Sequence, residues 1–338
     1  MLKIIRISII VFISMGTVAA GAAEVNVYSA RKEALIKPAL DKFTQQTDIQ
    51  VNLITGKADA LISRIKTEGK FSPADVLLTT DAGRLVRAKQ LGLTQAYQSD
   101  TIHSQVPEQL RDEQGHWFAL TMRARPIMVV KGSAQASLTL DYESLAGTDL
   151  NGKVCVRSSS NIYNQSMISA LIHQVGAEKA ETFVSGLVKN FARPPKGGDR
   201  DQIKALVAGQ CQFAIANTYY LAGMLQSKDP SQVAIAKQVH VIWPNQDDRG
   251  AHVNISGAAL AKEAPNSDSA KQLLDFLLNE DSQSWYAQAN HEYPVRAGVA
   301  NSPVLSEMGA FKAEQVPLAR VGELNTEAVK LMDRAGWK

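Results

Sequence analysis

After its first two dozen residues, the sequence alternates between strand-like and helix-like segments, and this alternation limits the possible folds most. Short runs rich in β-branched and apolar residues are separated by segments with apolar residues at helical spacing: 24–29, 32–46, 50–54, 58–68 and 75–78. A further helix is expected to begin after Asp81, an N-cap residue, and to run to Gln90. Strands that alternate with helices form βαβ units, so this half predicts a mostly parallel sheet covered by helices.

The same pattern returns in the second half of the chain. Residues 117–130 are extended and contain Arg125-Pro126, so they are expected to leave the first unit. A second alternation of strands and helices follows at 154–156, 163–175, 177–189, 200–208 and 213–216. Extended segments at 240–243 and 251–260 are expected to bring the chain back. The sequence therefore predicts an α/β protein of two lobes, each a mostly parallel sheet flanked by helices, joined by two crossing strands.

The predicted boundaries of these lobes follow from the crossings. The first lobe is expected to comprise residues 24–124, with residues 245–300 returning to it. The second lobe is expected to comprise residues 125–244, with 301–338 packing on it. A chain of this length exceeds what one ordinary hydrophobic core needs, which also favours two lobes.

The first 23 residues have the three parts of a secretory signal peptide. Lys3 and Arg6 precede an apolar run at 7–18, and small residues follow at 19–23. The apolar run is shorter than the ~20 residues that a membrane-spanning helix needs. We therefore expect export, with cleavage near Ala22 or Ala23.

The net charge argues against a nucleic-acid partner. The whole chain carries a formal charge of +3, and the leader holds two of the basic residues and no acidic ones. The remainder is nearly neutral, so it offers no field that would attract nucleic acid or an anionic membrane.

The two cysteines, Cys155 and Cys211, both lie in strand-like runs. An even pair in an exported protein favours one disulfide, which would stabilise the fold by about 4 kcal/mol in the chain-entropy model. Two buried, unpaired thiols are the alternative. In neither case can two cysteines alone form a thiolate metal site.

Three tyrosines lie where strands are predicted to meet helices in the second lobe. Ligands of open α/β sheets bind outside the carboxyl ends of the strands, and Tyr163, Tyr219 and Tyr220 lie at the junctions that follow two such strands. Phenolate oxygen is a hard, anionic donor that suits a hard, highly charged cation. Neighbouring helical residues point about 100° apart, so Tyr219 and Tyr220 could share an ion only at an irregular helix entry, which Asn217 as a cap would provide. The alternative for each is a surface tyrosine whose hydroxyl meets water.

Arginines are the candidate anion ligands. Arg31 stands at the end of the first predicted strand, and Arg123 and Arg125 are two residues apart on an extended segment, so both should point to one side. The arginine fork can bind a carboxylate or carbonate through two hydrogen bonds. A solvated position at the hinge is the alternative for Arg123 and Arg125. Tyr28 lies inside the first strand, where packing in the core is expected.

Six segments, in the same order and at similar separations, resemble the periplasmic ferric-ion-binding proteins of iron ABC transporters (the FbpA/FutA type). They are Val27–Arg31, Ser72–Val76, Arg123–Arg125, Val154–Ser158, Asn161–Gln165 and Ala216–Leu221. The resemblance implies the type II periplasmic-binding-protein architecture and Fe³⁺ as cargo. It also implies an ABC transporter permease in the inner membrane as partner and the periplasm as location; a monomer is expected.

The resemblance also implies roles for individual residues. Tyr163, Tyr219 and Tyr220 would bind the iron. A synergistic anion, carbonate or bicarbonate, would be held by arginine, with Arg31 at the best-matching position and Arg123 and Arg125 as further candidates. Several relatives carry a histidine or tyrosine ligand just after the first strand, whereas this chain has Lys32 and Glu33 there. No first-lobe histidine or tyrosine ligand is therefore expected from that loop.

Two other functions compete with iron capture. The same fold could bind an organic or oxyanion solute, with the arginines gripping it and the tyrosines forming the walls. An exported enzyme is the second alternative, but the sequence has no G-x-S-x-G nucleophile elbow, and its six histidines are scattered. We therefore predict no catalytic residues.

Overall fold

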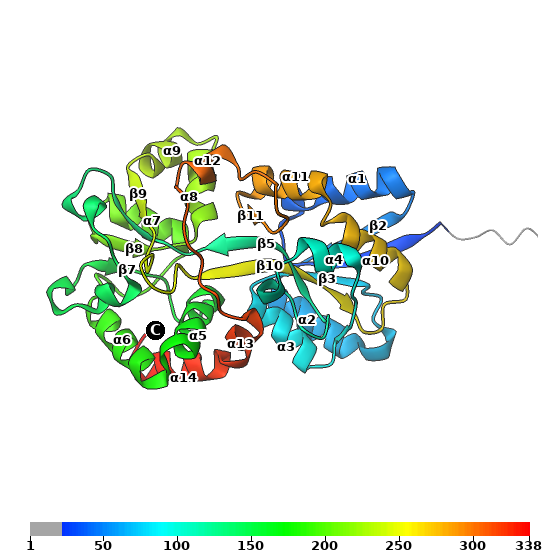
Figure 1. Cartoon of the computed structure of the whole chain (residues 1–338), viewed down its shortest axis with the longest axis horizontal. Coiled ribbons are helices and arrows are strands. Elements are labelled where there is room, and N and C mark those ends of the chain that lie inside the picture. The colour runs from blue at the N-terminus through cyan, green and yellow to red at the C-terminus, as the bar shows by residue number, and fades with distance from the viewer. Residues whose placement is uncertain (1–21) are drawn as a thin grey trace, which may run out of the picture.

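The computed structural model describes residues 22–338, and these residues form two lobes that lie side by side (Figure 1). The expected signal peptide lies almost wholly outside the described residues. No helix between residues 22 and 338 is long and apolar enough to cross a membrane.

The first lobe is built on one sheet with strand order β11-β5-β10-β3-β1-β2, in which β4 also pairs with β10. Its strands are β1 Glu24–Ser29, β2 Gln50–Thr55, β3 Val76–Thr80, β4 Thr94–Gln95, β5 Phe118–Ala124, β10 Val253–Ala261 and β11 Tyr293–Pro294. Its helices are α1 Lys37–Thr47, α2 Ala58–Glu68, α3 Ala82–Gln90, α4 Asp100–Gln105, α10 Ser267–Phe276 and α11 Glu280–Asn290. The expected helix at 32–46 begins only at Lys37, because Pro38 has no amide hydrogen and is tolerated only in the first turn of a helix.

The second lobe has a smaller sheet with strand order β7-β8-β6-β9. Its strands are β6 Ile127–Val130, β7 Val154–Cys155, β8 Phe213–Ile215 and β9 Val239–Ile242. Its helices are α5 Ile162–Val175, α6 Ala177–Lys189, α7 Asp199–Val207, α8 Thr218–Leu225, α9 Pro230–Ala236 and, from the end of the chain, α14 Asn325–Arg334.

Both sheets are mixed rather than mostly parallel. In the first lobe β1 runs parallel to β2 and β3, whereas β10 is antiparallel to β3 and β5. In the second lobe β7 and β8 are parallel, and β6 is antiparallel to β8 and β9. Each of these antiparallel pairs includes a strand that adjoins a crossing between the lobes, namely β5, β6, β9 or β10. The βαβ pattern predicted the parallel strands but carried no information about the direction of the returning ones.

Within residues 22–338, three segments connect the lobes. The first two are the expected ones, at Arg125-Pro126 between β5 and β6, and at residues 243–252 between β9 and β10. A third segment follows β11 and includes α12 (Pro303–Ser306), which packs against α8. It then leads to α13 (Leu318–Glu323), which contacts α3 of the first lobe and α5 of the second.

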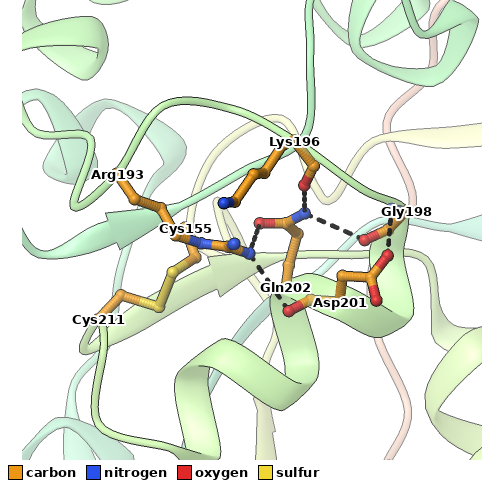
Figure 2. The surroundings of a disulfide bond; sticks show 7 residues. All are labelled: Cys155, Arg193, Lys196, Gly198, Asp201, Gln202 and Cys211. Carbon is orange, nitrogen blue, oxygen red and sulfur yellow. Dashed lines mark hydrogen bonds between the residues drawn. A yellow bond between two sulfur atoms is a disulfide. The ribbon is translucent and has the colours of Figure 1, made fainter.

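The predicted disulfide is present and lies in the core of the second lobe. Cys155 and Cys211 are bonded with their Cα atoms 5.8 Å apart, and Figure 2 shows the bond beside the loop that carries Arg193 and Lys196. The bond joins β7 to the residues just before β8. Tyr28 is fully buried in the first lobe, as expected for a residue inside the first strand. Its hydroxyl donates a hydrogen bond to Glu68.

Candidate metal centre

The two helices that carry the candidate tyrosines begin at the same edge of the second-lobe sheet. β7 and β8 are parallel neighbours, so their carboxyl ends lie together. The Asn161 side chain caps α5 by accepting from the Tyr163 N–H at 3.1 Å, which places Tyr163 in the first helical turn. α8 begins at Thr218, so Tyr219 and Tyr220 also occupy a first turn.

The three phenols converge, as the sequence predicted. The rings of Tyr163 and Tyr219 both adjoin the guanidinium of Arg123. The Tyr219 and Tyr220 rings lie 4.3 Å apart between centroids, with an angle of 35° between their planes. All three side chains are half-buried. Three hard oxygen donors therefore share one small region.

The expected role of Asn217 as a side-chain cap was wrong. Asn217 occupies the N-cap position of α8, but its side chain makes no capping hydrogen bond within that described helix. Its Oδ1 instead accepts from Arg125 at 2.9 Å. The entry of α8 is thus fixed by a residue from the crossing strand rather than by its own cap.

Arg123 brings a first-lobe cation to the phenols. It is buried at the end of β5, and its Cζ lies 5.1 Å from the Tyr163 ring centroid and 5.9 Å from that of Tyr219. Nη2 donates to the Ile255 carbonyl at 2.5 Å. Nε and Nη1 are buried and have no partner among residues 22–338. Arg123 therefore has two donors left for an anion.

Arg157 is a second cation at the phenols, and the sequence reasoning did not single it out. It follows β7, and its Cζ lies 5.6 Å from the Tyr163 ring centroid. Asp199 pairs with it at 3.4 Å. The rule that pointed to the tyrosines, position after the carboxyl end of a strand, applies equally to Arg157 and could have found it.

The surroundings shift the three phenols in different directions. Burial raises the pKa of Tyr163, but the charge of Arg123 opposes burial, and the pKa lies below its usual value. Burial, together with the charge of Tyr163, raises the pKa of Tyr219 well above its usual value and also raises that of Tyr220. The pKa of Tyr163 is therefore shifted toward the phenolate form, whereas those of Tyr219 and Tyr220 are shifted toward the phenol form.

The other two predicted anion ligands already have partners. Arg31 is buried in the first lobe, where Nη2 and Nη1 donate to the two oxygens of Glu292 at 2.6 and 3.3 Å. Arg125 donates to Asp199, Asn217 and Asn164 in the second lobe. Lys32, beside Arg31, is exposed. Of the three predicted arginines, Arg123 is the one that adjoins the phenols with donors to spare.

Between residues 22 and 338, no group of three or more histidine, cysteine, aspartate or glutamate side chains could hold a metal ion.

The chain is similar to a known protein family and to a characterised relative. The profile of a family described as bacterial extracellular solute-binding proteins matches residues 71–312. The chain is 46% identical over 315 residues to "Iron uptake protein A1" of Synechocystis sp., a match that covers 93% of this chain and 88% of the relative.

Two solved structures show the same fold. The Trichodesmium protein described as FutA in complex with iron and citrate ligands is 46% identical, with a TM-score of 0.91 and coverage of 94% of this chain and 100% of that one. The apo ferric ion-binding protein A of Pasteurella haemolytica is 41% identical, with a TM-score of 0.87 and coverage of 94% and 98%.

Proposed function

The chain belongs to the bacterial extracellular solute-binding proteins, and we propose that it captures ferric iron between its lobes and delivers it to the membrane permease of an ABC transporter. It is a transport protein and not an enzyme. The observation that carries the proposal is the grouping of Tyr163, Tyr219 and Tyr220 beside Arg123 at one edge of the second-lobe sheet.

The donor set suits Fe³⁺ in hardness and in charge. Three phenolates supply three negative charges, which balance the trivalent ion in a half-buried site. The same set would leave an excess negative charge around a divalent ion. The ion's own charge offsets the burial that holds Tyr219 and Tyr220 in the phenol form.

A synergistic anion would complete the coordination of the iron, and Arg123 is the residue that fits it. Its Nε and Nη1 are buried donors with no partner in the described chain, next to the phenols. A buried charged donor without an acceptor is costly, and carbonate or bicarbonate would supply that acceptor. The citrate named in the Trichodesmium structure is likewise an oxygen-donor anion that an arginine fork can bind.

Export and delivery complete the proposal. The leader at 1–23 would direct the chain to the periplasm, with cleavage near Ala22 or Ala23. With iron bound between the lobes, surfaces of both lobes would meet the permease. The protein would act as a monomer.

Visible absorption tests the proposal. Ferric iron should turn the purified protein orange to red through phenolate-to-iron charge transfer, and Tyr163→Phe, Tyr219→Phe and Tyr220→Phe should each weaken or shift the band. Tyr97→Phe is the matched control, because its hydroxyl donates to Asp275 in the first lobe, and the colour should not change. A protein that stays colourless with ferric citrate, yet is stabilised by an organic or oxyanion solute, would favour the competing function.

A further inference from the structure

We propose that Arg125 is the positioning residue of the metal centre, which holds the tyrosine-bearing helices in register from the crossing between the lobes. This inference rests on the proposed function and gives Arg125 a role different from the anion binding expected from sequence.

The guanidinium of Arg125 bonds to the second lobe through three side chains. Nη1 donates to Asp199 Oδ2 at 3.1 Å and to Asn217 Oδ1 at 2.9 Å, and Nη2 donates to Asn164 Oδ1 at 2.6 Å. Arg125 and Asp199 are both buried, with side chains 2% and 0% exposed. Such bonds are little weakened by water, so they fix the positions of the groups they join.

Each of these three side chains belongs to the start of a different helix. Asn164 follows Tyr163 in α5, Asn217 precedes α8 with Tyr219 and Tyr220, and Asp199 is the first residue of α7. Asp199 Oδ2 also accepts from the backbone N–H of Asn217 at 3.0 Å. One guanidinium therefore connects the two helices whose phenols must meet.

Asn164 also holds the residues that lead into α5. Its Nδ2 donates to the carbonyls of Arg157 and Ser158 at 2.8 and 3.1 Å. Those residues link β7 to α5, so the position of Tyr163 depends on Asn164, and Asn164 is held by Arg125.

The backbone of Arg125 is fixed where the chain passes between the lobes. Its N–H donates to the His252 carbonyl at 3.1 Å, on the second crossing segment. Its carbonyl accepts from the Tyr142 hydroxyl at 2.6 Å. The guanidinium thus extends from a fixed point, and its length and planar shape set the spacing between the starts of α5 and α8.

Lysine cannot take this role. Its single ammonium nitrogen cannot replace two guanidinium nitrogens, Nη1 and Nη2, that donate to different helices. Loss of side chains that orient metal ligands typically weakens metal binding by about 10–100-fold. We expect the same range here, because misplaced phenols can no longer all reach one ion.

Two variants and a matched control test the inference. Arg125→Lys keeps the charge but loses the fork, and Asn217→Ala removes one acceptor without removing a cap bond from α8. Asn190→Ala is the control, because Asn190 is equally buried in the second lobe but its Nδ2 donates to the Leu145 and Gly147 carbonyls. Iron affinity is measured by competition with citrate at the charge-transfer band, and stability by melting of the metal-free protein.

Arg125→Lys and Asn217→Ala should bind iron about 10–100-fold more weakly. Asn190→Ala should lower the melting temperature but leave affinity within about twofold of the original protein. Unchanged affinity in both test variants would overturn the inference, and so would an equal loss in the control, which would reduce the effect to general stability.

A second measurement needs no iron and separates this inference from the proposed function. Crystal structures of the metal-free original protein and of Arg125→Lys are superposed on the second-lobe strands. The starts of α5 and α8 should move relative to one another, and unchanged spacing would overturn the inference whether or not the protein binds iron. Failure of the original protein to bind ferric iron would instead remove the proposed function alone.

Discussion

Removal of the Cys155–Cys211 disulfide should destabilise the second lobe by about 4 kcal/mol. The two cysteines are 56 positions apart, and both are buried. In the chain-entropy model, closing a loop of this length removes about 14 cal/mol/K of entropy from the unfolded chain, which is about 4 kcal/mol at 25 °C. The bond therefore acts mainly on the unfolded state.

The assay is urea unfolding of Cys155→Ala/Cys211→Ala beside the original protein at 25 °C. The free energy of unfolding should fall by about 4 kcal/mol, and the melting temperature by roughly 8–16 °C if the lobe unfolds as a unit. The original protein, unfolded and refolded in reductant, is the control and should show the same loss.

The phenol site should survive this substitution at 25 °C, because Arg125 joins the starts of α5 and α8 independently of the disulfide. A loss of stability below about 1 kcal/mol would refute the loop-entropy reasoning. A well-folded variant that no longer binds iron would show that the disulfide, and not Arg125, sets the spacing of the helices.

Three further predictions concern the site itself. Replacing Tyr163, Tyr219 or Tyr220 by Phe should weaken ferric binding by more than ~100-fold, beyond the usual effect of supporting residues, in a competition titration; a loss below tenfold for all three would contradict their assignment. Iron affinity should rise with pH, because Tyr219 and Tyr220, whose pKa values are raised mainly by burial, keep their protons in the metal-free protein and must release them to the ion. Each released proton makes affinity about tenfold higher per pH unit, and titrations from pH 6 to 8 that show no rise would contradict this. Arg123→Met should abolish the gain in affinity that bicarbonate gives the original protein, and an equal gain in both would exclude Arg123 as the anion ligand.

The sequence predicted those features that depend on local pattern. Alternating strands and helices predicted two lobes, and the rule about the carboxyl ends of strands predicted that Tyr163 lies near Tyr219 and Tyr220. The disulfide followed from an even cysteine pair in an exported chain. Each of these inferences uses residues close together in sequence or a topological rule that brings distant segments to one edge.

The sequence pattern did not predict which side chains, distant in sequence, would pair. Arg31 is neutralised by Glu292, 261 positions away, and nothing in the local pattern around Arg31 indicates that partner. Arg125 sits beside Arg123 in sequence, yet one bonds to the second-lobe helices and the other keeps free donors beside the phenols. Side-chain partners depend on how elements pack, and periodicity carries no information about that.

The most direct test of the account is anomalous diffraction at the iron edge from crystals of the ferric-loaded protein. The account predicts one strong peak within bonding distance of the hydroxyl oxygens of Tyr163, Tyr219 and Tyr220. A peak elsewhere, or one that touches fewer than two of these oxygens, would contradict it.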